Sequence, residues 1–120
     1  MARSDLILLA VLAVVALVFG LTGLAAQLGA HPFWSDTVVW IGAALGLGLG
    51  VAAKRAPWGL GLGGFALVFL LAIWAATGGK ARFVASYAED AMAGRLWYFG
   101  WIAVFVGLFG ALFLLLRHRR

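Results

Sequence analysis

The chain has 120 residues, of which 66% are hydrophobic and only 11% are charged, and its formal net charge is +5. Soluble domains carry roughly half apolar and a quarter charged residues, so a water-soluble globular fold is excluded for this composition. The absence of cysteine excludes disulfides, thiolate metal sites and thiol nucleophiles.

Four apolar runs predict an all-α, polytopic membrane protein whose residues 1–120 form a single transmembrane domain. The runs cover residues 6–28, 37–53, 57–77 and 96–116, and none contains Asp, Glu, Lys, Arg or His. Crossing about 30 Å of hydrocarbon takes roughly 20 helical residues, so only the second run is short. The first run exceeds the roughly 7–15 residues of a signal-peptide core, and we expect it to be retained as a span.

Glycines recur one helical turn apart in the second and third runs, on either side of a short hinge at residues 54–57. Gly42, Gly46 and Gly50 precede the hinge, and Gly59 and Gly63 follow it. Small residues at this spacing let membrane helices approach closely. We therefore expect the second and third helices to pack against each other as an antiparallel pair.

Residues 80–93 are the longest stretch that is not simply apolar. With 100° per residue, Phe83 and Tyr87 share one side while Arg82 and Glu89 share the other. This pattern predicts a short amphipathic helix lying in the membrane interface. The last span follows, and Gly100 and Gly107 give it small positions for helix packing.

The basic residues lie at the ends of the runs and predict the orientation. One side would carry six and the other three of the nine Lys and Arg residues, and the larger group includes Lys54, Arg55 and Arg117 together with Arg119 and Arg120. The positive-inside rule then predicts an inner-membrane protein with both termini cytoplasmic. Lipid headgroups explain these charges, so we expect no nucleic-acid partner.

Tryptophans cluster near the ends of the spans, as the aromatic belts of membrane proteins do. We expect interface anchors at Trp34, Trp58, Trp97 and Trp101. A stacked pigment or quinone could use the same side chains.

Candidate catalytic residues are scarce, and we expect no enzyme activity. Serines lie at helix ends or in residues 80–93, and Glu89 and Asp90 point about 100° apart on a helix, so they do not form a facing carboxylate pair. No zinc, calcium or phosphate-loop motif is present, so we expect no metal and no cofactor. His31 is a candidate axial ligand for a chlorophyll-type pigment, against the alternative of a polar loop residue.

In its length and predicted helix number the chain resembles the small multidrug transporters. That resemblance implies a membrane-embedded glutamate in the first helix, and this first span has no acid. An ionisable residue within the membrane is the usual marker of a transport pathway. The resemblance therefore transfers no site residue to this chain.

The leading hypothesis is a small non-catalytic accessory, assembly or stabilising subunit of a larger inner-membrane complex, respiratory or photosynthetic, acting by glycine-mediated helix packing. Its partners would be lipids and other transmembrane subunits or copies of itself. The alternatives are a homo-oligomeric small transporter or channel, and a pigment- or quinone-binding subunit.

Overall fold

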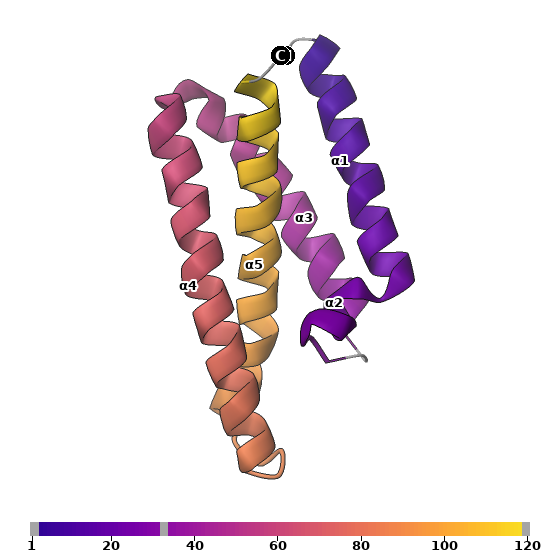
Figure 1. The fold of residues 1–120 in the computed structure, drawn as a ribbon, viewed down its shortest axis with the longest axis vertical. Helices are drawn as coiled ribbons and strands as arrows, with labels where there is room; N and C mark the ends of the chain where they lie inside the picture. Colours follow the sequence, from indigo (N-terminus) through magenta and orange to yellow (C-terminus); the bar gives the residue numbers. More distant parts are fainter. Residues whose placement is uncertain (1–2, 32–33, 119–120) are drawn as a thin grey trace.

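The computed structural model of the chain describes residues 3–31 and 34–118, and this part is built from helices alone (Figure 1). The helices are α1 (Arg3–Thr22), α2 (Leu24–Leu28), α3 (Ser35–Ala52), the 3-10 turn η1 (Ala53–Arg55), α4 (Trp58–Ala85) and α5 (Ala91–His118). By length and composition, α1, α3 with η1, α4 and α5 can each cross a membrane. The fold is therefore all-helical, with four helices compatible with a multi-pass membrane protein.

The central element of the bundle is α5, which lies between α3 and α4 and packs against both (Figure 1). Half of the most apolar stretch of α5 is buried, against 11% of that of α4. The expectation that the second and third helices pack against each other is therefore wrong. Their connection includes η1 and the extended residue Ala56, and it is wide enough for α5 to lie between the helices it joins.

The core follows one side of α5, where Phe105, Phe109 and Phe113 are spaced by one turn and are almost fully buried. Phe105 meets Phe19 of α1 edge to face, with ring centroids 5.6 Å apart. Buried Val38 of α3 belongs to the same cluster. The phenylalanines thus fill the space that α5 shares with α1 and α3.

The first apolar run is not one helix, because α1 ends at Thr22 and the chain turns at Gly23. Gly23 has φ +70° and its missing side chain would meet no described atom within 4 Å. Conformation is therefore the reason for glycine here, since L side chains rarely adopt this backbone region. The predicted span of residues 6–28 is corrected to α1 followed by the short α2.

The predicted interfacial helix at residues 80–93 is also wrong. The helix α4 continues through Lys80 to Ala85, and it ends in a Schellman motif in which the amide of Ala88 donates to the carbonyl of Phe83 (3.0 Å). Asp90 then caps α5, its carboxylate accepting the amide proton of Ala93 (3.0 Å). The amphipathic stretch is therefore the tip of a long α4–α5 hairpin.

Gly78 and Gly79 precede residues 80–93, yet α4 continues through both of them. A Cβ at Gly79 would lie 2.7 Å from the backbone nitrogen of Trp97. Glycine at position 79 therefore lets α4 approach α5 closely, and the helix continues past this residue. With 28 residues, α4 is about 42 Å long and exceeds the roughly 30 Å hydrocarbon layer.

Candidate functional site

The glycines of α3 lie against α5. A Cβ on Gly42 would lie 2.7 Å from the carbonyl oxygen of Ile102, and one on Gly46 would lie 2.6 Å from that of Val106. A Cβ on Gly50 would lie 3.1 Å from Cδ2 of the Phe113 ring. Backbone of the neighbouring helix thus occupies the space that side chains at Gly42 and Gly46 would need.

The glycines of α5 serve the opposite interface, with α4. A Cβ on Gly100 would lie 2.9 Å from Cα of Ala76, and one on Gly107 would lie 2.7 Å from the backbone nitrogen of Phe69. Glycines of α3 therefore pack against α5 on one side, and glycines of α5 pack against α4 on the other.

Gly59 and Gly63 of α4 take no part in these interfaces. A Cβ at either position would meet no described atom within 4 Å, and both residues are exposed. Leu70 and Trp74 lie on the same side of α4, and their side chains are 63% and 76% exposed. We call this set, Gly59, Gly63, Leu70 and Trp74, the outer face of α4.

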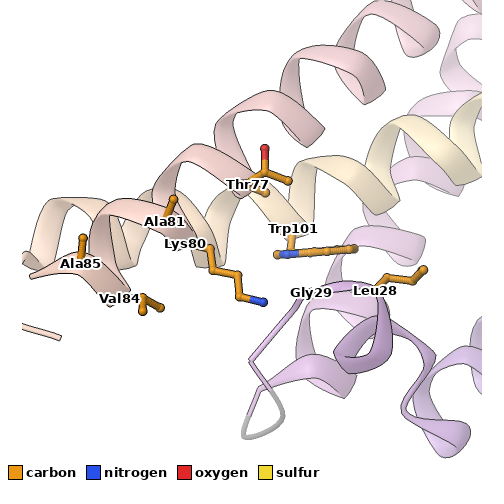
Figure 2. A pocket seen from close by; sticks show the side chains of 9 residues that line it. Leu28, Gly29, Thr77, Lys80, Ala81, Val84, Ala85 and Trp101 are labelled. Atoms are coloured by element: carbon orange, nitrogen blue, oxygen red, sulfur yellow. The ribbon is translucent and has the colours of Figure 1, made fainter. Parts of the chain in front are cut away.

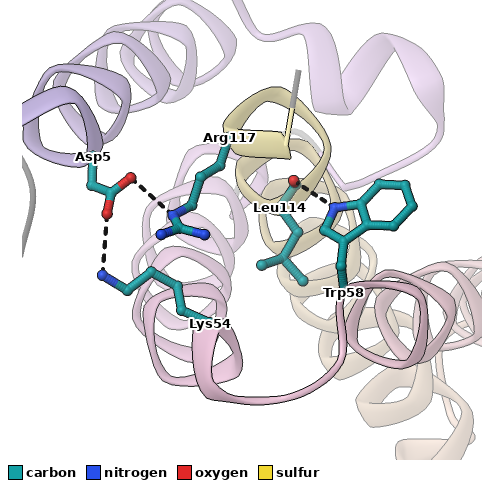
Figure 3. Close-up of polar contacts among 5 residues, drawn as sticks. All are labelled: Asp5, Lys54, Trp58, Leu114 and Arg117. Carbon is teal, nitrogen blue, oxygen red and sulfur yellow. Dashed lines mark hydrogen bonds and ion pairs between the residues drawn. The ribbon is translucent and has the colours of Figure 1, made fainter. Parts of the chain in front are cut away.

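The tryptophans expected to be interface anchors lie in two kinds of place. Trp58 is 39% exposed, and its indole donates to the carbonyl of Leu114 (2.9 Å, Figure 3). Trp97 and Trp101 are only 6% and 8% exposed and belong to the core. Two of the four expected anchors are thus inside the bundle.

His31 lies in an aromatic cluster beside Trp34 and Trp97. Its ring stacks on Trp34 at 5.9 Å and meets Trp97 edge to face at 5.5 Å, and Trp34 in turn contacts Tyr98 at 5.1 Å. The indole of Trp97 donates to the carbonyl of Gly29 (3.0 Å). His31 is thus at the exposed edge of a set of rings that fasten the first loop to α5.

A buried ionic cluster joins three elements at the end of the bundle where the described chain begins and ends. The carboxylate of Asp5, 1% exposed, accepts hydrogen bonds from Nζ of Lys54 (3.1 Å) and Nε of Arg117 (2.9 Å, Figure 3). The start of α1, η1 and the end of α5 are thereby linked. Among residues 3–31 and 34–118, no group of three His, Cys, Asp or Glu side chains could hold a metal ion.

An apolar cleft opens at the other end of the bundle, between α2 and α4 and over α5 (Figure 2). Its outer part measures about 470 Å³, and Lys80 and Trp101 lie in its wall. An inner part of about 260 Å³ continues between Phe19 and Phe69 toward Leu108. Both parts share Leu28, Ala76, Thr77 and Trp101.

The chain matches no family model, and neither a curated protein nor a solved structure is significantly similar to it.

Sequence reasoning missed the ionic cluster and the cleft. The sequence could have predicted the ion pairs of Asp5, because this residue precedes the first apolar run on the same predicted side of the membrane as Lys54 and Arg117. Lys80 and Trp101 had none, because 21 residues separate them in sequence and only the α4–α5 hairpin brings them to one cleft.

Proposed function

We propose that this protein is a small accessory or assembly subunit of a larger membrane complex, which it joins through the outer face of α4. The observation that carries the proposal is that Gly59 and Gly63 face outward with no described neighbour, although Gly42, Gly46, Gly100 and Gly107 are all used in packing. A second transmembrane helix is the partner that this face fits.

Glycine on a lipid-facing helix surface lowers helix stability and adds no favourable contact. It destabilises a helix by about 0.5–1 kcal/mol relative to alanine, and lipid tails gain little from its missing side chain. Against another helix the same position allows close backbone approach, which drives association in membranes. Two such positions one turn apart therefore favour a helix partner over lipid alone.

Trp74 adds a large contact surface to this face. Its side chain is 76% exposed and lies beyond Leu70 on the same side of α4. Tryptophan is enriched among the residues that dominate interface energetics. The outer face thus combines a close-approach site with an aromatic contact.

We propose a plasma-membrane location with both ends of the chain cytoplasmic. The contact of Asp5 with Lys54 and Arg117 supports placing the start of α1, the connection η1 and the end of α5 on the same side of the membrane. The count of basic residues supports that side being cytoplasmic. Arg119 and Arg120 contribute to the count and lie outside the described residues.

In-membrane photocrosslinking tests the proposal. A photoreactive amino acid at Leu70 should give a specific product with a different membrane protein, whereas one at Ile7, an exposed position of α1, should not. Gly63→Leu should abolish the product. The matched control is Gly64→Leu, which adds the same bulk one residue along, on another side of α4 and also in open space.

Three outcomes would contradict the proposal. Equal effects of the two leucine variants would remove the outer face as the cause. Crosslinking only to copies of the same chain would favour the homo-oligomeric transporter or channel. A chain that forms no product at Leu70 in its native membrane would have only lipid on this face.

A further inference from the structure

We propose that the cleft between α2 and α4 binds an anionic phospholipid, with one acyl chain in its apolar interior and the headgroup oxygens at Lys80 and Trp101. The inference rests on residues other than those of the outer face of α4, since none of the four residues of that face lines the cleft.

The size and walls of the cleft suit a lipid chain. Its outer part, about 470 Å³, is within the range of roughly 300–1,000 Å³ that is typical of small-molecule sites. The inner part is lined by apolar side chains, including Phe69, Ile73 and Phe105. From Trp101 to Leu108 it follows about 10 Å of α5, so a chain can enter the bundle lengthwise.

Lys80 supplies a cation at the mouth. Its side chain extends from α4 toward α2 (Figure 2), and its Nζ atom would be 3.8 Å from a Cβ on Gly29. Within the described part of the chain its ammonium forms no ion pair or hydrogen bond, and its nearest interaction is with the Trp97 ring, 5.8 Å away. The ammonium therefore keeps its donors for a ligand.

Trp101 supplies a second donor from inside the bundle. The residue as a whole is 92% buried, and its indole N–H forms no hydrogen bond within the described part of the chain. No buried side-chain nitrogen or oxygen atom of the described residues lacks a partner, so this N–H is open to the cleft. Figure 2 shows the nitrogen edge of this indole on the Lys80 side of the cleft. A ligand oxygen in the cleft can therefore accept a hydrogen bond from this indole.

The wall of the cleft offers no competing carboxylate. Besides Lys80 and Trp101, Thr77 is the only polar side chain that lines the outer part, and its hydroxyl donates to the carbonyl of Ile73 in its own helix (2.8 Å). Two donors above an apolar interior require a ligand that has acceptor oxygens at one end and a hydrocarbon chain at the other.

The depth of these groups indicates a membrane lipid. The apolar run of α4 ends at Thr77 and Lys80 follows three residues later, whereas Phe69 and Leu108 lie within apolar runs. With these helices across a membrane, the ammonium would lie at headgroup level and the two apolar residues would lie deeper. A phospholipid from the surrounding bilayer has its phosphate and its chain at these two depths. Lys80 then favours lipids with a net negative charge.

Native mass spectrometry of the full-length protein in detergent micelles tests the site with defined lipids. Phosphatidylglycerol should remain bound as a single molecule per chain, and phosphatidylcholine should bind roughly tenfold more weakly. Lys80→Gln should weaken phosphatidylglycerol binding roughly tenfold, and Lys80→Arg should restore it. Trp101→Phe, which removes the N–H and keeps a ring, should weaken binding roughly three- to fivefold.

Arg82→Gln is the matched control, because it removes the same charge two residues away from a side chain outside the cleft wall. A loss for Arg82→Gln equal to that for Lys80→Gln would show general surface attraction and overturn the proposal, as would equal binding of the two lipids. Oleate serves as a competing probe. If oleate displaces phosphatidylglycerol at equal concentration, the ligand is a free fatty acid and the phospholipid assignment is wrong.

Discussion

The contact between α3 and α5 makes a prediction in which two neighbouring glycines respond with opposite sign to the same substitution. Gly46→Ala places a Cβ 2.6 Å from the carbonyl oxygen of Val106, and the other close atoms are also backbone. Backbone cannot rotate away as a side chain can, so the helices must separate. Gly48→Ala places its Cβ where no described atom lies within 4 Å.

The magnitude follows from this geometry. Reaching an ordinary contact of 3.4 Å requires α3 and α5 to move apart by about 0.8 Å, and a gap of this size forfeits about a quarter to a half of the dispersion attraction per contact. Overpacking of this kind costs about 1–3 kcal/mol. Both variants gain about 0.5–1 kcal/mol of helix propensity, so the difference between them isolates the steric cost.

Unfolding by SDS in mixed micelles, followed by tryptophan fluorescence, measures this difference. We expect Gly48→Ala to be slightly more stable than the unsubstituted protein and Gly46→Ala to be less stable by about 1–2 kcal/mol. Equal stability of the two variants would refute close backbone packing of α3 on α5. The more drastic Gly46→Leu should disrupt the fold far more than Leu47→Ala.

The same assay tests the two ends of the bundle. Asp5→Asn removes the negative charge that Lys54 and Arg117 share and should destabilise the protein by about 1–3 kcal/mol. This is less than the loss expected for a fully buried ion pair, because both cations can reach solvent. An unchanged unfolding midpoint would show that the ionic cluster does not contribute to stability. Asp90→Ala should cost about 1 kcal/mol through the lost cap of α5. Tyr87→Gly should instead stabilise by about 1 kcal/mol, since Tyr87 has φ +57° and its exposed ring has little to lose, and a loss of stability would contradict this account. For the orientation, cysteine at position 87 should be labelled from the periplasmic side and cysteine in place of Ser4 from the cytoplasmic side, and labelling of both from one side would exclude the topology.

The sequence by itself predicted four helices long and apolar enough to cross a membrane, and the fold has four such helices. Runs without charge, each about as long as a bilayer is thick, leave a transmembrane helix as the only way to satisfy the backbone. The sequence did not determine where the helices end, because glycine has two structural uses that sequence does not separate. At Gly23 it permits a left-handed turn that ends α1, whereas at Gly79 it permits close approach and the helix continues.

The order of packing was decided by the tertiary structure alone. In lipid every helix surface is apolar, so hydrophobic periodicity cannot tell which face meets protein, and α5 between α3 and α4 could not be deduced from the short hinge. The same reason separates the glycines of α4 into Gly79, which packs, and Gly63, which does not. The cleft likewise depends on long-range placement, because its two donors come from different helices and its depth comes from the space that α2 and α4 leave above α5.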